Sequence, residues 1–378
     1  MRDELADLAS RLVAIDSVNP ELVPGGAGET EIARFVQTWL EEAGLDVERT
    51  EVAPGRWNVV GAARGSGAGR SLTLNAHMDT VGVEGMERPF QPRIEEERLY
   101  GRGAYDMKAS LAAIMLVGAR ARELDLRGDV VVAAVADEEV ASVGSIAVAS
   151  SWPTDAAIVA EPTEEQVAIA HRGFAWLDVQ VHGRAAHGSR PELGIDAIAK
   201  MGRILVGLEE LDRSLRAEPS HPLLGSGSLH ASLIEGGQEL SSYPERCLLR
   251  LERRTIPSET PERVEAEIRD VIDRAAAADP DLVADVRTTF AQSPFEVAEA
   301  EDVVAALLRQ ATAVTAEEVD VVGVQFWTDA AILASAGIPT VLYGPAGEGA
   351  HAVVEWVDLD SATRCAEVYL AVVRDFCA

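Results

Sequence analysis

Short apolar runs recur in the first half of the chain, and each is followed by a residue whose side chain can bind a metal. Residues 71–76 (SLTLNA), 129–136 (DVVVAAVA) and 156–160 (AAIVA) are three such runs, and the next residue is His, Asp or Glu in turn. Runs of this length without polar alternation are typical of strands buried on both faces of a parallel sheet. Ligands of open α/β sheets gather at the carboxyl ends of such strands, so the sequence predicts a site there.

Helical patterns alternate with these runs. In residues 31–42 the apolar positions lie on one helical face, and Gly44 follows as a stop signal. Residues 108–121 predict a second helix. Because strands alternate with helices as far as residue 173, the sequence predicts an α/β fold, with a mixed, mostly parallel sheet and helices on both faces.

The pattern changes after Gly173. Residues 174–181 alternate between apolar and polar, which is typical of a strand in a sheet with one solvated face. Helix and strand patterns that complete a two-layer α/β unit follow, and the buried-strand pattern returns near residue 290. We therefore expect two domains: a larger one formed by residues 1–173 and 290–378, and an inserted one formed by residues 174–289.

Charge and composition exclude some classes of partner. The chain has 33 Lys and Arg residues against 63 Asp and Glu residues, a net charge of −30, which argues against nucleic acid. No apolar run approaches the length of a membrane span, and the charged N-terminal segment lacks the apolar core of a signal peptide. We therefore expect a cytoplasmic protein without a membrane partner. The three cysteines have no CxxC spacing, which predicts reduced thiols rather than a thiolate metal site.

The polar residues at the predicted strand ends suit a pair of borderline-hard divalent ions, because they offer oxygen and imidazole ligands. Taken singly, several have a structural explanation: Asp106 would cap the helix that follows it, and His77 would satisfy a local hydrogen bond. Glu138 and Glu139 are harder to explain, since adjacent carboxylates at a buried strand end repel each other unless a cation or proton lies between them. The candidate residues are His77, Asp79, Asp106, Glu138, Glu139, Glu161 and His351.

The motifs around these residues resemble the acetylornithine deacetylase / succinyl-diaminopimelate desuccinylase family, whose relatives include aminoacylases, glutamate carboxypeptidases and other peptidases that use two metals. Their order and spacing extend over almost the whole chain and are more specific for the family than for one substrate. The matching segments are 17–20 (SVNP), 77–80 (HMDT), 101–108 (GRGAYDMK), 137–139 (DEE), 161–163 (EPT), 183–189 (GRAAHGS) and 344–351 (GPAGEGAH).

This resemblance implies a zinc-exopeptidase-like catalytic domain that holds two divalent metal ions. Zinc is the expected metal, with cobalt and manganese as alternatives because their ligand preferences overlap. In the family pattern Asp106 would bridge the two ions. His77 and Glu161 would complete one site, and Glu139 and His351 would complete the other.

The resemblance also implies roles for residues that do not bind metal. Glu138 would be the general base that takes a proton from the attacking water, and Asp79 would orient the neighbouring histidine ligand. The inserted domain would be a lid or dimerisation domain, from which His187 reaches the site of the neighbouring subunit. Arg254 would recognise a substrate carboxylate. Surface positions without function are the alternatives for His187 and Arg254.

The expected function is metal-dependent hydrolysis of the amide bond of an N-acyl amino acid, in the manner of acetylornithine deacetylase, by a homodimer formed through the inserted domain. One alternative keeps the catalyst and changes the substrate to a short peptide, which makes the chain a carboxypeptidase or dipeptidase. The other alternative is a catalytically inactive metal-binding scaffold. Such scaffolds usually lose a ligand or the base, whereas every expected position is filled here.

Overall fold

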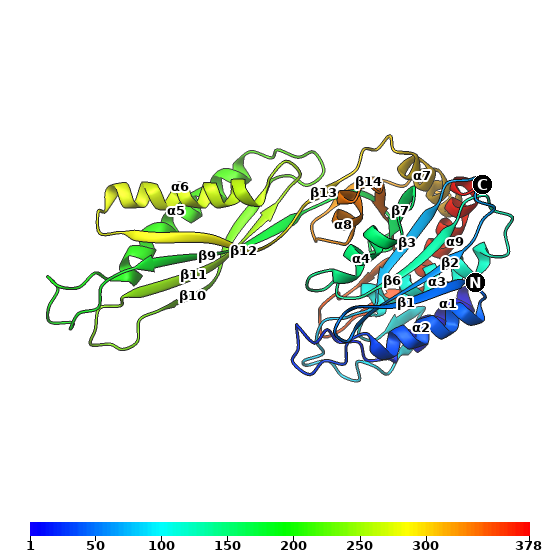
Figure 1. Cartoon of the computed structure of the whole chain (residues 1–378), viewed down its shortest axis with the longest axis horizontal. Helices are drawn as coiled ribbons and strands as arrows, with labels where there is room; N and C mark the ends of the chain where they lie inside the picture. Colours follow the sequence, from blue (N-terminus) through cyan, green and yellow to red (C-terminus); the bar gives the residue numbers. More distant parts are fainter. The chain divides into compact units, whose positions relative to one another are not determined.

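The computed structural model describes all of residues 1–378, which divide into two compact units (Figure 1). Unit 1 comprises Met1–Ile169, Val297–Val322 and Thr328–Ala378, and unit 2 comprises Ala170–Glu296 and Gly323–Trp327. Unit 2 is thus wider than the inserted domain expected from the sequence. It also takes in a short segment, Gly323–Trp327, that the sequence pattern places with the larger domain.

Unit 1 is built on a mixed sheet with the strand order β1-β2-β6-β3-β7-β15-β8. Its centre is parallel, because β3 pairs in parallel with β6 and β7, and β7 with β15. β1 and β2 are antiparallel at one edge, and β14 pairs with β8. The two-residue strand β13 pairs with Ala170 and His171 of β8, which like β13 itself belong to unit 2. The bounds are β1 Asp46–Ala53, β2 Arg56–Ala63, β3 Leu72–His77, β6 Val130–Val135, β7 Ala156–Val159, β8 Val167–His171, β13 Phe295–Glu296, β14 Val321–Val324 and β15 Thr340–Leu342.

Helices cover both faces of this sheet. Consecutive residues of β6 point to opposite faces: Val131 packs with Val148 of α4, whereas Val132 lies against Gly118 of α3. α3 packs in turn against α1 and α9. The fold class predicted from the sequence is therefore confirmed. The helices of unit 1 are α1 Arg2–Val13, α2 Thr30–Glu42, the single-turn η1 Ala104–Lys108, α3 Ala109–Ala121, α4 Val143–Ser151, α7 Asp302–Thr315, α8 Ala330–Ser335 and α9 Leu359–Phe376.

A second, small antiparallel sheet in unit 1 has the strand order β16-β17-β5-β4. It joins two segments that are far apart in sequence, since Trp356 of β17 pairs with Tyr100 of β5. This pairing brings the loop that carries His351 next to the turn that carries Asp106. The bounds are β4 Arg93–Glu95, β5 Arg98–Tyr100, β16 Gly347–Glu348 and β17 Trp356–Asp358.

Unit 2 has two layers: a four-stranded antiparallel sheet in the order β10-β11-β9-β12, and helices α5 and α6 on one face of it (Figure 1). The alternation in β9 explains this arrangement, because Ala175, Leu177, Val179 and Val181 are buried while the residues between them are not. The bounds are β9 Gly173–His182, β10 Ser228–Gly236, β11 Arg246–Thr255, β12 Val283–Gln292, α5 Ala197–Ala217 and α6 Pro261–Ala278. In neither unit is a helix both long and apolar enough to span a membrane.

Candidate metal centre

Three neighbouring parallel strands deliver the metal-type residues to one edge of the sheet of unit 1. His77 is the last residue of β3 and pairs with Val135, the last residue of β6. β6 is followed by residues 137–139, and β7 on the other side of β3 is followed closely by Glu161. The carboxyl ends of all three strands therefore meet, which is the position where α/β sheets place their ligands.

His77 lies at the centre of a first group of ligand atoms. Its Nε2 atom is 3.0 Å from Oδ1 of Asp106 and 3.8 Å from Oε1 of Glu161. The ligand atoms of His77, Glu138 and Glu161 all lie within 4.8 Å of one another. The imidazole is fixed from its other side, because Nδ1 lies 2.9 Å from the backbone carbonyl oxygen of Asp79. This contact leaves Nε2 free to face the carboxylates.

His351 joins the centre through a second group. Its Nε2 atom is 3.3 Å from Oδ2 of Asp106 and 3.2 Å from Oε2 of Glu139. Asp106 therefore presents one carboxylate oxygen to His77 and the other to His351, which is the geometry a carboxylate needs to bridge two cations. The side chain of His351 is 56% exposed, whereas that of His77 is 1% exposed, so the second group is the one open to solvent.

The acidic residues of the centre are difficult to ionise together. Burial, reinforced by the charge of Glu161, raises the pKa of Glu138 well above its usual value. Burial likewise raises the pKa of Glu161 and of Glu139, with Asp106 adding to the effect in both. Buried carboxylates at this spacing need positive charge between them.

The two histidines supply part of that charge. Burial alone would raise the pKa of Asp106, but hydrogen bonds from His351 and His77 outweigh it, so its pKa lies below the usual range. The same contacts, with Glu139, raise the pKa of His351 to about 10. Burial opposes protonation of His77, yet its pKa is raised by Asp106 and Glu161. Two imidazoles still leave an excess of carboxylates, and a site of buried oxygen and nitrogen donors without sulfur fits divalent ions such as zinc.

The hydrogen-bond partners of the Asp79 carboxylate differ from the histidine that the family resemblance implies. Its Oδ1 is 3.7 Å from Nδ1 of His77, beyond hydrogen-bond distance, so the histidine is oriented by the backbone of Asp79 instead. The carboxylate accepts the backbone N–H groups of Glu138 and Glu139, at 3.2 and 3.3 Å, and the side-chain amide of Asn19 at 2.8 Å. Asp79 therefore holds the turn that presents both glutamates.

The sequence patterns do not identify two of the buried carboxylates at the centre. Glu355 accepts the backbone N–H of Asp106 at 3.1 Å and also pairs with Arg102 at 2.6 Å, so it holds the turn of Asp106 in place. Asp329 accepts a hydrogen bond from Ser145 at 2.6 Å, and its charge raises the pKa of Glu138. Neither follows a buried strand in the sequence, so no pattern marks them.

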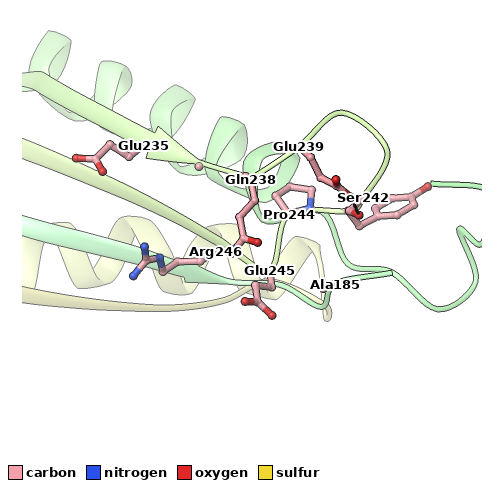
Figure 2. A pocket seen from close by; sticks show the side chains of 11 residues that line it. Ala185, Glu235, Gln238, Glu239, Ser242, Pro244, Glu245 and Arg246 are labelled. Atoms are coloured by element: carbon pink, nitrogen blue, oxygen red, sulfur yellow. Dashed lines mark hydrogen bonds between the residues drawn. The ribbon is translucent and has the colours of Figure 1, made fainter. Parts of the chain in front are cut away.

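The remaining two predicted site residues, His187 and Arg254, belong to unit 2. His187 is exposed, and its Nδ1 atom lies 2.8 Å from Oγ of Ser189. The backbone of His187 forms an isolated antiparallel β-bridge with Ser242. Ser242 lines a cavity of about 660 Å³ between loops of unit 2 (Figure 2). Arg254 lies on β11 with its Nε 2.7 Å from Glu252 and its guanidinium 5.3 Å from the ring centre of Phe174. The structure thus brings together His77, Asp106, Glu138, Glu139, Glu161 and His351 in unit 1.

Comparison with known proteins finds relatives along nearly the whole chain. An N-formyl-4-amino-5-aminomethyl-2-methylpyrimidine deformylase of Halalkalibacterium halodurans is 28% identical over an alignment of 412 positions, which covers 100% of this chain and 95% of that protein. An acetylornithine deacetylase of Myxococcus xanthus is 29% identical over 359 residues, which cover 91% of each.

Solved structures share the fold. A tripeptidase from Staphylococcus aureus has a TM-score of 0.81 at 20% identity, covering 100% of this chain and 99% of that one. A dinuclear metal-binding peptidase from Bacillus subtilis has a TM-score of 0.76 at 17% identity, with the same coverage. Residues 73–375 match the sequence profile of Peptidase family M20/M25/M40. The chain therefore belongs to Peptidase family M20/M25/M40 and is a metal-dependent hydrolase.

Proposed function

We propose that the chain removes a small acyl group from the nitrogen of an N-acyl amino acid by hydrolysis of the amide bond, with two divalent metal ions bound at the centre. The observation that carries the proposal is the position of Asp106 between His77 and His351, with Glu138 beside them. The similarity to an acetylornithine deacetylase over 91% of the chain supports the substrate class.

The proposed ligands divide between the two ions. Asp106 is shared, His77 and Glu161 complete one site, and Glu139 and His351 complete the other, with zinc as the metal. When bound, two such ions favour deprotonation of a water near neutral pH and polarise the scissile carbonyl. The histidine contact to the backbone of Asp79 fixes which ring nitrogen is offered to the metal.

Glu138 is the proposed proton carrier. It takes a proton from the attacking water and gives it to the amine that leaves, which requires a pKa near the working pH. Burial and neighbouring carboxylates raise its pKa in that direction. Since its oxygen lies among the same group of ligand atoms as His77 and Glu161, a role as metal ligand is the competing assignment.

Unit 2 is proposed to form a homodimer through β10 and α5. β10 is an edge strand, and Leu233 and Ile234 on it are 58% and 53% exposed. α5 packs on β10 and exposes Ile198 and Val206. An unpaired edge with exposed apolar residues favours pairing with another strand. The proposed role of His187 at a neighbouring subunit depends on this assembly. Arg254 is proposed to recognise a substrate carboxylate, and the proposed location is the cytoplasm.

A second substrate class follows from one observation. The pyrimidine deformylase relatives align over 100% of this chain, more than the acetylornithine deacetylases do. An N-formyl group on an aminomethyl heterocycle is therefore the second candidate substrate. The chemistry at the centre is the same, because both reactions cleave an amide of a small acyl group.

A hydrolysis screen tests the proposal. The zinc-loaded chain is assayed against N-formyl, N-acetyl and N-succinyl amino acids, an N-formyl aminomethylpyrimidine and dipeptides with a free carboxyl end. The expected result is turnover of an N-acyl amino acid above that of every dipeptide. Preferred cleavage of a dipeptide assigns the chain to the peptidases of its family, and absence of all turnover in a metal-loaded protein contradicts the proposal.

A further inference from the structure

A buried chain of polar side chains leads from the start of α2 to the turn that carries Glu138. It begins with Glu29, which is 0% exposed and accepts hydrogen bonds from Nε and Nη2 of Arg56 through its two oxygens. The third nitrogen of this guanidinium, Nη1, lies 2.8 Å from Oδ1 of Asp137. Arg56 itself is 3% exposed, so all these contacts are shielded from solvent.

Asp137 anchors the turn from within. Its backbone has φ +70°, a left-handed conformation that is uncommon for a residue other than glycine. Its carbonyl oxygen accepts the backbone N–H groups of Ala141 and Ser142, which closes the turn. Its own N–H donates to Glu29 at 3.2 Å. The side chain and backbone of Asp137 are therefore both held by the Glu29–Arg56 pair.

Asn19 connects this pair to the metal centre. Its side-chain amide donates to Oδ1 of Asp137 at 3.1 Å and to Oδ2 of Asp79 at 2.8 Å. Asp79 in turn accepts the backbone N–H groups of Glu138 and Glu139. Asn19 and Asp137 both lie in segments that match the family motifs, but neither is among the proposed ligands or the proposed base.

We propose that Arg56 is a positioning residue, which acts through Asp137, Asn19 and Asp79 to fix the place of Glu138 at the metal centre. The inference rests on the proposed function, because it assigns Glu138 a catalytic task. Arg56 hydrogen-bonds to Glu29 and forms an ion pair with Asp137, so its planar guanidinium sets their separation as well as balancing their charge.

The substitution Arg56→Lys keeps the positive charge and removes the planar guanidinium with its paired N–H donors. The turn would then lose one of its fixed points, and displacement of a reacting group by about 1 Å costs on the order of a hundredfold in rate. The matched control is Arg364→Lys. Arg364 donates Nε and Nη2 to the two oxygens of Glu165 in the same forked geometry, and neither residue contacts the turn of residues 137–142.

The experiment compares Arg56→Lys with Arg364→Lys in the full-length, zinc-loaded chain. For Arg56→Lys we expect kcat to fall about ten- to a hundredfold, with KM and bound zinc unchanged within a factor of two. In the metal-free protein, hydrogen exchange of the amides of residues 138–142 should be about tenfold faster, and exchange in β3 unchanged. Arg364→Lys should leave kcat, KM, bound zinc and hydrogen exchange at the wild-type values.

An Arg56→Lys protein that loses only thermal stability, with kcat and local exchange like those of Arg364→Lys, overturns the inference. If Arg56→Lys does not fold, Asn19→Ala takes its place, since it removes the link between Asp137 and Asp79, and the same split between kcat and KM is expected. A wild-type protein without hydrolytic activity refutes the proposed function instead. In that case accelerated exchange of residues 138–142 in Arg56→Lys still supports the positioning role, and unchanged exchange overturns it.

Discussion

The carboxylate of Asp106 lies between two histidines, because one oxygen faces His77 and the other faces His351. Neither histidine contacts the other in this arrangement; they are connected through Asp106. Loss of this carboxylate should therefore affect both groups of ligand atoms, whereas loss of either histidine should affect one.

Glu138 and Glu139 are adjacent in sequence but should respond differently to the loss of charge. In Glu138→Gln we expect kcat to fall by a factor of about 10² to 10⁴, as for loss of a general base, with two zinc ions still bound. In Glu139→Gln we expect one zinc ion to be lost. Metal analysis alongside kinetics separates the two, and loss of an ion in Glu138→Gln would assign that residue as a ligand.

Asp329 should make the metal-free protein sensitive to pH. Burial raises its pKa to about 6, above the value of roughly 4 in the unfolded chain. The folded state therefore binds this proton more tightly, so the contribution of Asp329 to stability is complete below pH 4 and is lost as the pH rises through 6.

Asp329→Asn should remove that dependence. Relative to the wild type, the variant should gain on the order of 2 kcal/mol in the free energy of unfolding between pH 4 and pH 8 in the metal-free state. Urea unfolding at several pH values measures the difference. Parallel stability curves for the two proteins across this range would contradict the assigned pKa.

At the scale of elements, the position of the site follows from the parallel strands, whereas its precision follows from the irregular segments. β3, β6 and β7 bring His77, Glu138 and Glu161 to one edge because they are neighbours in the sheet. The turn of Asp106 is irregular and is held by Glu355, which accepts three of its backbone N–H groups and pairs with Arg102.

Glu355→Ala should therefore lower the stability of the folded protein. It leaves Arg102 buried without its partner and frees the backbone N–H groups of the turn, so we expect a loss of about 3–5 kcal/mol in the free energy of unfolding. Glu95→Ala is the control, because its ion pair with Arg93 is exposed and should contribute less than about 1 kcal/mol. Urea unfolding of both variants provides the measurement. Equal losses would mean that the buried pair does not stabilise the turn.

The edge strands of unit 2 allow a matched test of the proposed dimer. Leu233→Asp places a charge on β10, where we expect the dimer to dissociate. Val283→Asp places the same charge on β12, the opposite edge, where Val283 is equally exposed at 58%. Sedimentation velocity should find a monomer only for the β10 variant. A monomeric wild type, or dissociation by both variants, contradicts the proposed interface.

The sequence predicts features of the molecule that arise from local patterns. Unbroken apolar runs identify the buried strands, and the residue types that follow them identify His77 and Glu161 as site candidates. Taken alone, Asp106 is explained by a helix cap, and it becomes a metal candidate only together with the other acidic and histidine residues and the family motifs. Arg56, Glu355 and Asp329 act through tertiary contacts over long sequence separations, so a single sequence gives no sign of them. The same holds for Gly323–Trp327, which joins unit 2 through tertiary contacts.

For the whole molecule, metal binding should stabilise one unit and not the other. All proposed ligands lie in unit 1, whereas unit 2 has a separate apolar core between its sheet and its two helices. Zinc that binds the folded state raises its stability by mass action. Calorimetry should show a transition that chelation shifts to lower temperature and a second that chelation leaves in place. A uniform shift of all unfolding would show that the two units unfold together.

In the proposed centre one carboxylate, Asp106, joins two metal sites. Titration of the metal-free chain with zinc, followed by calorimetry and metal analysis, measures whether it does so. We predict two ions per chain for the wild type, one for His351→Ala and none bound tightly for Asp106→Ala. Two tightly bound ions in Asp106→Ala, or a single ion in the wild type, would show that Asp106 does not bridge two metal sites.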